Sequence, residues 1–413
     1  MEKKRVVITG VGVIASNGIG KDDFWEAIFK GISGIKPISL FDASVFIAKT
    51  AGEAKDFDPA VFLGNKGLRI LDRSTKLVNS AAKLALDDAK FSVDEKNTHS
   101  TGVAIGNTLG SIRSIGEFDR EALTEGPQYV NPALFPNTVI NSPASQISIR
   151  FAIKGFNATI STGFCASLDA MKYAVDFLKL GRAKVVLAGA VEELCEQLFL
   201  GFYKTGFLSG LKEGEFEISC PFDKRRNGAI LGEGSAVFVL EDLESALSRG
   251  ANIYAEISGF GSGFDSYRIN KYCPTGKGLK ESMRQAIQDA GITTAEIDYI
   301  SAAANSTIAA DKIESQAIKE VFGVDSQRAR VSSIKSMTGE CFSASGALQV
   351  AAAIGAINRQ MIPPTINYEK KDPDCDLNYV VNRSEGVKVN NLMVNAFGPS
   401  GCNTSMVISK FGG

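Results

Sequence analysis

Short runs of β-branched and apolar residues alternate with helical patterns along the whole chain, and this rhythm restricts the fold more than any other feature. Strand-like runs include VVITGVG at 6–12 and AKVVLAGA at 183–190, while 74–89 and 168–181 have the apolar spacing of helices. Continuous apolar strands are typical of sheets that are covered by helices. The sequence therefore predicts an α/β layered protein.

The same rhythm returns in the second part of the chain. A strand-like run at 251–263 precedes a helical pattern at 278–291, and further strands and helices follow. We therefore expect two similar halves, 1–250 and 251–413. Because no Pro/Gly/Ser-rich linker separates them, they are expected to share one core.

The composition excludes several classes of partner. The 45 basic and 46 acidic residues nearly balance, which argues against binding to nucleic acid or to an anionic membrane. No stretch is long enough to span a bilayer. Seven cysteines, odd in number and without CxxC spacing, argue against a disulfide framework and a zinc site, so we expect no metal and a cytoplasmic location.

Two further features restrict the chemistry. His99, in the polar stretch DEKNTHS, is the only histidine, so a mechanism that needs two imidazoles is excluded. The segment GVGVIA at 10–15 loosely fits a dinucleotide fingerprint, but SNGIG follows where a helix should continue. We therefore expect a tight turn after a strand there, and no cofactor.

Five long stretches carry a family resemblance: RVVITGVGVIASNG (5–18), PFDKRRNGAILGEGSAVFVLED (221–242), DKIESQAIKEVFG (311–323), SSIKSMTGECFSASGALQVAAAIGAI (332–357) and NAFGPSGCNTSMV (395–407). From about residue 4 to the C-terminus the chain resembles the β-ketoacyl-acyl carrier protein synthases of the thiolase superfamily. The resemblance implies a thiolase fold, a duplicated five-layered α-β-α-β-α architecture, and a two-fold dimer. It also implies decarboxylative condensation of carrier-bound acyl chains by a cysteine, two histidines, a lysine and an oxyanion hole.

The nucleophile position falls within TISTGFCASLDAM at 159–171. In the family three residues separate the cysteine from a Leu-Asp-Ala helix, and counting back from Leu168 across three residues reaches Phe164, with Cys165 one residue late. Successive side chains on a helical turn point about 100° apart, so Cys165 should face away from the tunnel. A one-residue insertion that returns Cys165 to the site is the alternative.

The histidine positions are also substituted. Ala303 stands where the family has the first imidazole, and Asn305 and Thr307 follow in the loop that meets pantetheine. Lys335 is retained in KSMTGE, but Glu340 replaces the second imidazole. A carboxylate there would repel a substrate anion, and we expect it to pair with Lys335 instead.

The resemblance places the oxyanion-hole donor at Pro399, in the loop FGPSG. Proline has no N–H, so one donor is lost, which typically costs about 3 kcal/mol of transition-state stabilisation. Asp311 and Glu314 match the family pattern, and structural roles are expected for them.

These four departures predict a ketosynthase-fold subunit without the condensation machinery, similar to the chain-length factors of type II polyketide synthases. Its expected partners are an acyl carrier protein and a homologous active 3-oxoacyl-acyl carrier protein synthase, whose acyl tunnel it would shape, or a second copy of itself. The alternatives are a divergent acyltransferase or condensing enzyme that uses Cys165, and a module that holds a lipid or an acyl carrier.

Two groups of residues are candidates for contact with acyl chain or carrier. Leu134 and Phe135 correspond to a segment near the partner's pocket, while Phe202 and Phe397 match aromatic positions of the acyl channel, although ordinary packing explains all four equally well. A basic patch could meet the acidic helices of a carrier protein, unless it is a solvated helix face. Its candidates are Lys66, Arg69, Arg73 and Lys204.

Overall fold

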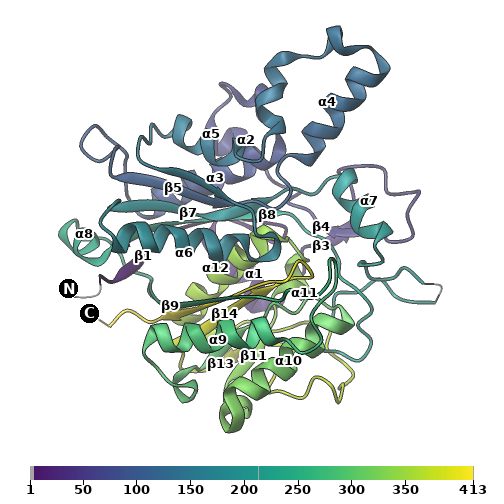
Figure 1. Cartoon of the computed structure of the whole chain (residues 1–413), viewed down its shortest axis with the longest axis vertical. Coiled ribbons are helices and arrows are strands. Elements are labelled where there is room, and N and C mark those ends of the chain that lie inside the picture. Colours follow the sequence, from purple (N-terminus) through teal and green to yellow (C-terminus); the bar gives the residue numbers. More distant parts are fainter. Residues whose placement is uncertain (1–3, 213, 413) are drawn as a thin grey trace.

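The computed structural model describes residues 4–212 and 214–412 (Figure 1). At its centre is a large sheet whose two halves have the same strand order. The first half contains, in spatial order, β6 (Asn157–Ile160), β5 (Thr101–Gly106), β7 (Val185–Glu192), β8 (Gly234–Asp242) and β1 (Val6–Ala15). The second half continues with β9 (Ala255–Phe264), β15 (Cys402–Ser409), β14 (Asn391–Phe397), β10 (Tyr299–Ser301) and β11 (Arg330–Ser332). β1 and β9 join the halves through two residue pairs.

Helices lie above, between and below the two halves of the sheet (Figure 1). α3 (Arg73–Asp88) covers β1 and β8, while α6 (Ala166–Lys179) and α12 (Ser343–Arg359) lie between the halves. α9 (Lys277–Ala290) covers β9 and β15, with α10 (Ile308–Phe322) beside it. This is the expected five-layered thiolase fold, and its central core draws on both halves, as the missing linker predicted.

Paired glycines reveal the duplication at atomic level. A Cβ on Gly12 of β1 would lie 1.9 Å from the carbonyl oxygen of Ala81 in α3, and one on Gly261 of β9 would lie 1.9 Å from that of Ser282 in α9. Each glycine lets a helix backbone approach its strand closely. The expectation of a tight turn at Gly10 and Gly12 is therefore wrong, because β1 continues through both residues.

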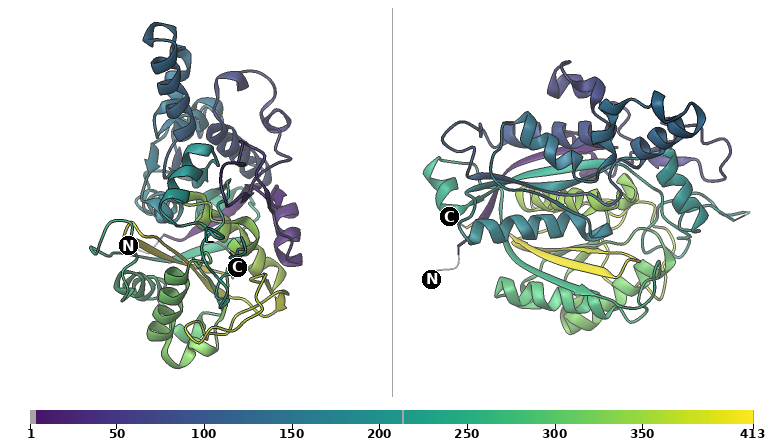
Figure 2. Two further views of the ribbon diagram at one scale, coloured as in Figure 1. Left: turned by 90° about the vertical axis from the view of Figure 1, so that its right-hand side faces the viewer. Right: turned by 45° about the horizontal axis from the view of Figure 1, so that its top comes forward.

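An arm projects from the first half, formed by α4 (Ile112–Thr124), η2 (Pro127–Tyr129) and η3 (Pro132–Thr138) (Figure 2). None of the residues of α4 is buried, and several apolar side chains of the arm are exposed. The other elements are β2 (Gly18–Ile19), α1 (Lys21–Lys30), β3 (Ile35–Pro37), β4 (Thr50–Gly52), α2 (Pro59–Leu63), η1 (Leu68–Ile70), α5 (Ser142–Arg150), η4 (Gly163–Cys165), α7 (Glu196–Lys204), α8 (Leu243–Ser248), η5 (Thr294–Glu296), η6 (Gly323–Gln327), α11 (Lys335–Thr338), β12 (Met361–Ile362) and β13 (Glu385–Gly386).

The boundary of the halves, the position of His99 and the absence of a membrane span were also expected from the sequence. The division at residue 250 stays a prediction, and it falls between the end of α8 and the start of β9. His99 lies exposed in a turn, as its polar surroundings predicted. Among the described residues no helix is both long and apolar enough to cross a membrane.

Candidate functional site

The turn before α6 is held by a set of hydroxyl groups. Gly163 has φ +65°, a value that glycine adopts without strain, and its carbonyl accepts a 3.1 Å hydrogen bond from Thr108 Oγ1. On the other side, Asp169 accepts hydrogen bonds from the hydroxyls of Thr162 and Thr404. These contacts fix the direction in which the next two side chains leave the turn.

Phe164 and Cys165 leave this turn toward different parts of the core. The ring of Phe164 is 7% exposed and meets the rings of Phe342 and Phe207 edge-on, at centroid distances of 5.3 and 6.2 Å. Cys165 is fully buried in the central core, and its Sγ donates a 3.1 Å hydrogen bond to the carbonyl of Ala396. The two side chains therefore lie in different core clusters, while the predicted position of Phe164 toward an acyl tunnel stays a prediction.

The surroundings of Cys165 oppose ionisation of its thiol. Burial raises the pKa of Cys165 well above its ordinary value, and the nearby carboxylate of Asp169 raises it further. A reactive cysteine needs an electropositive, partly exposed site that favours the thiolate. The Cys165 thiol is therefore poorly suited to nucleophilic attack.

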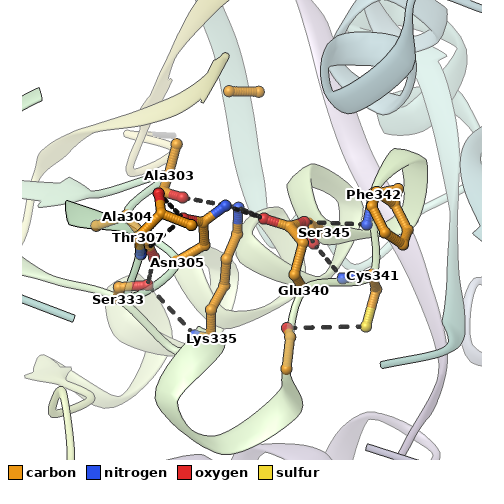
Figure 3. A network of polar contacts seen from close by, with 12 residues as sticks. Ala303, Ala304, Asn305, Thr307, Ser333, Lys335, Glu340, Cys341, Phe342 and Ser345 are labelled. Atoms are coloured by element: carbon orange, nitrogen blue, oxygen red, sulfur yellow. Dashed lines mark hydrogen bonds and ion pairs between the residues drawn. The ribbon is translucent and has the colours of Figure 1, made fainter. Parts of the chain in front are cut away.

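The ion pair expected between Lys335 and Glu340 is present, with Nζ and Oε2 2.9 Å apart and both side chains almost fully buried (Figure 3). Asn305 Nδ2 donates to the same oxygen at 2.9 Å. The other oxygen, Oε1, accepts the backbone N–H of Phe342 at 3.0 Å and the hydroxyl of Ser345 at 2.7 Å. The Glu340 carboxylate thus has two donors on each oxygen.

The polar groups of the loop after β10 bond to one another and to Lys335 and Glu340 (Figure 3). Ala303 presents only a methyl group, and its carbonyl accepts a 2.8 Å hydrogen bond from Lys335 Nζ. Thr307 Oγ1 donates to Asn305 Oδ1 at 2.8 Å. The two side chains predicted to meet pantetheine are thus bonded to each other.

Asp311 and Glu314 of α10 bind the backbone of this loop, as expected for structural carboxylates. Glu314 accepts the backbone N–H groups of Ala303 and Ala304 at 3.0 and 2.8 Å, and Asp311 accepts that of Asn305 at 3.0 Å. Burial raises the pKa of Glu314 to about 7 and that of Asp311 to about 6. Both groups keep the loop backbone satisfied inside the protein.

The two aromatic residues predicted to line one acyl channel lie in different clusters. Phe202 stacks on Phe342 at a centroid distance of 4.5 Å, whereas Phe397 meets Tyr272 at 5.5 Å. Pro399, in the loop between β14 and β15, is partly buried. The contact of these residues with an acyl chain stays a prediction.

The basic patch expected for carrier docking needs one correction. Arg73 Nε donates to Glu233 Oε2 at 2.7 Å, and Glu233 is fully buried, so Arg73 is tied to the core rather than free for a partner. Lys66, Arg69 and Lys204 are exposed. The ion pair could not be predicted from the sequence, because Arg73 and Glu233 are far apart along the chain.

On the arm, Leu134 and Phe135 are 38% and 56% exposed. Phe135 contacts Phe118 of α4 at a centroid distance of 6.0 Å, and Leu134 lines a cavity of about 800 Å³ between the arm and α3. Their contact with a partner stays a prediction.

Sequence reasoning missed Phe342 and Phe207, which surround Phe164. The available signal was the density of aromatic residues in FLGFYKTGF at 199–207, because an aromatic group opposite Phe164 would fill the space around it. The positive φ of Phe342 had no signal in the sequence.

A duplicated α/β fold with a tight turn before α6 and a buried lysine at the start of α11 defines a thiolase-fold condensing-enzyme scaffold. Comparison with family models agrees with this class: residues 3–246 match "Beta-ketoacyl synthase, N-terminal domain" and residues 254–369 match "Beta-ketoacyl synthase, C-terminal domain". The chain belongs to the β-ketoacyl synthase family.

Full-length relatives support this assignment. The chain is 39% identical to 3-oxoacyl-[acyl-carrier-protein] synthase 2 of Coxiella burnetii, over 99% of both chains, and 36% identical to the protein of the same name in Synechocystis, over 100% and 99%. Among solved structures, "The ishigamide ketosynthase/chain length factor" matches with a TM-score of 0.93 and 33% identity, over 99% and 100% of the two chains. A "type II PKS acyl-carrier protein in complex with its ketosynthase bound to the hexaketide" matches with a TM-score of 0.91 and 30% identity, over the same shares.

Proposed function

We propose that this chain is a ketosynthase-fold subunit that does not condense acyl groups itself but pairs with an active 3-oxoacyl-acyl carrier protein synthase and shapes its acyl tunnel. The observation that carries the proposal is the divergence of Phe164 and Cys165 at the start of α6. A phenyl ring cannot form a thioester, and the neighbouring thiol is buried and has a raised pKa.

The rest of the site supports the same proposal. The methyl group of Ala303 cannot transfer a proton, and Lys335 is bound to Glu340 and to the Ala303 carbonyl. Pro399 has no N–H to offer an oxyanion. Returning any one of these positions to the family residue would not restore the reaction. Each departure removes a different part of the catalytic machinery.

The proposal of these partners rests on the known proteins to which the chain is similar. One structural neighbour is named a ketosynthase/chain length factor, and another contains an acyl-carrier protein with its ketosynthase. Exposed apolar residues on the arm, including Phe135 at 56%, supply a surface that such a subunit could cover. We place the pair in the cytoplasm, where free cysteines are stable.

Co-expression tests this pairing. The tagged chain is produced together with ketosynthases of its own source that retain the cysteine and both histidines, and native mass spectrometry measures the complexes. We expect a one-to-one heterodimer that is weakened by Phe135→Asp but not by Val324→Asp, a control at a 96% exposed position outside the arm. Exclusive formation of a homodimer would refute the pairing.

Product analysis tests the effect on the tunnel. In the reconstituted pair, Phe135→Ala should lengthen the acyl products of the active subunit, because it removes a ring from the segment proposed to lie near the partner's acyl pocket, while Val324→Ala should leave them unchanged. An unchanged product distribution in both variants would contradict a tunnel-shaping role for Phe135.

The alternative enzyme that uses Cys165 is tested by mass spectrometry after incubation with acyl-carrier protein substrates. We expect no stable acyl group on the chain. Acylation that disappears in Cys165→Ala would overturn the non-catalytic proposal.

A further inference from the structure

Four phenylalanine rings form one continuous cluster beside the turn that precedes α6. Phe342 lies at its centre, edge-on to Phe164 at 5.3 Å and stacked on Phe202 at 4.5 Å. Phe207 closes the ring of contacts, at 5.2 Å from Phe202 and 6.2 Å from Phe164. Phe342 is fully buried, whereas Phe202 and Phe207 are partly exposed, so the cluster runs from the surface into the interior.

The central ring is held by a backbone conformation that phenylalanine rarely adopts. Phe342 has φ +47° and ψ −115°, in a region that is costly for any residue with a large side chain. Such a conformation costs about 1–3 kcal/mol and persists only where the surroundings enforce it. The residue therefore needs a specific restraint.

Glu340 provides that restraint. Its Oε1 accepts the Phe342 N–H at 3.0 Å and the Ser345 hydroxyl at 2.7 Å, and the same hydroxyl accepts the N–H of Cys341 at 2.8 Å. The turn from 340 to 345 is thus wrapped around one carboxylate at the N-terminus of α12, where the helix dipole favours an anion (Figure 3). Lys335 and Asn305 fix the opposite oxygen, so the carboxylate cannot swing away from Phe342.

We propose that Glu340 is a positioning residue that holds the Phe342 ring in the cluster, and that this ring closes an apolar site which would otherwise accept an aliphatic chain. The inference goes beyond the proposed function because it concerns the isolated chain, with or without a partner. Removing the ring, or releasing the backbone that carries it, should open a path from Phe202 and Phe207 at the surface to Phe164 inside.

The test measures binding of a fluorescent fatty acid, 11-(dansylamino)undecanoic acid, to the isolated full-length chain. Phe342→Gly removes the ring and tolerates the backbone conformation, and it should bind the probe at least about tenfold more tightly than the unmodified chain, as expected for newly accessible apolar surface. Phe222→Gly is the matched control, because this fully buried ring also has a positive φ, +68°, but stacks on Tyr379 in a different core cluster, so its removal should leave probe binding unchanged.

Variants of Glu340 separate positioning from a general structural role. Glu340→Ala should bind the probe like Phe342→Gly. Glu340→Gln keeps an acceptor oxygen for the Phe342 N–H, so the site should stay closed and the probe affinity should equal that of the unmodified chain. Asn305→Ala removes one of the two contacts that fix the other oxygen and should raise probe affinity less than Glu340→Ala does. If Glu340→Ala does not fold, Ser345→Ala serves instead, since it weakens the same turn and should raise probe affinity.

Two results would overturn the inference. Equal probe affinity in the unmodified chain and in Phe342→Gly would mean that the ring closes nothing. Tight binding by Phe342→Gly, with Glu340→Ala and Ser345→Ala unchanged from the unmodified chain, would mean that Glu340 does not position the ring. Neither result depends on capture of a ketosynthase, so this inference and the proposed function fail separately.

Discussion

Installing a cysteine at position 164 tests whether the displaced thiol is the main defect of this site. The variant Phe164→Cys is made together with Cys165→Ala, so that only one thiol remains at the turn. At position 164 the new thiol leaves the turn away from Asp169 and the central core, and it fills only part of the space of the ring. We expect iodoacetamide to label it at least about 100-fold faster than Cys165 is labelled in the unmodified chain, because thiolate character and access both increase.

Condensation should nevertheless stay absent. The missing oxyanion donor at Pro399 costs about 3 kcal/mol, and each missing imidazole removes at least about 100-fold, a further 3 kcal/mol. Added together, the three defects amount to about 9 kcal/mol, or roughly 10⁶-fold, and since such effects are not additive we expect a loss of at least about 10³-fold. The substitution also removes a ring that is 7% exposed, which should lower the free energy of unfolding by about 3 kcal/mol.

Peptide mass spectrometry measures labelling at position 164, and release of carbon dioxide from malonyl-acyl carrier protein measures the reaction. The C. burnetii relative serves as the reference for condensation. A variant that condenses within tenfold of that relative would refute the reasoning, because the remaining substitutions would then be harmless. Equal labelling rates for Cys165 and for the new thiol would refute the assignment of Cys165 to a protected core position.

Four further outcomes follow from the structure. Burial, together with the charge of Asp72, raises the pKa of Glu193 to about 8. The free energy of unfolding should therefore fall by at most about 5 kcal/mol as pH rises from about 4.5 to 8, because the folded state favours the protonated carboxyl. Urea unfolding at each pH measures this dependence, and Glu193→Gln should abolish its contribution. Gly12→Ala should lower the free energy of unfolding by about 3 kcal/mol, because its Cβ would collide with a helix carbonyl, and a change below 1 kcal/mol would contradict that packing. Arg73→Met should lower it by a similar amount, about 3 kcal/mol, by leaving a buried carboxylate without its partner, whereas Lys66→Glu should weaken carrier binding in a titration and leave the urea midpoint unchanged.

The sequence predicted the layered architecture well because strand and helix periodicity are local properties. It also predicted the pairing of Lys335 with Glu340, because charges that are buried with an apolar stretch are stable only when they are paired. Counting residues against the Leu-Asp-Ala pattern of the family placed Phe164 at the nucleophile position, and the fixed geometry of a helical turn then predicted a different direction for Cys165.

Contacts between distant segments were not predictable in the same way. Gly10 and Gly12 looked like a turn because their partner, a helix about 70 residues later, is invisible in the local pattern. Arg73 looked free because Glu233 lies 160 residues away. The positive φ of Phe342 depends on a carboxylate, a hydroxyl and a lysine that only the tertiary structure brings together.

In the site that we propose to be inactive, the polar groups differ from those that catalysis needs in the partners that remain free to them. Catalysis needs donors and acceptors whose best partners are the reacting atoms, so that bonding is strongest in the transition state. Here Lys335 and Asn305 already donate to Glu340, and Glu340 also accepts the backbone N–H of Phe342. Their bonding energy therefore contributes to the stability of one closed conformation. Such an arrangement suits a subunit whose shape, rather than whose chemistry, acts on a partner.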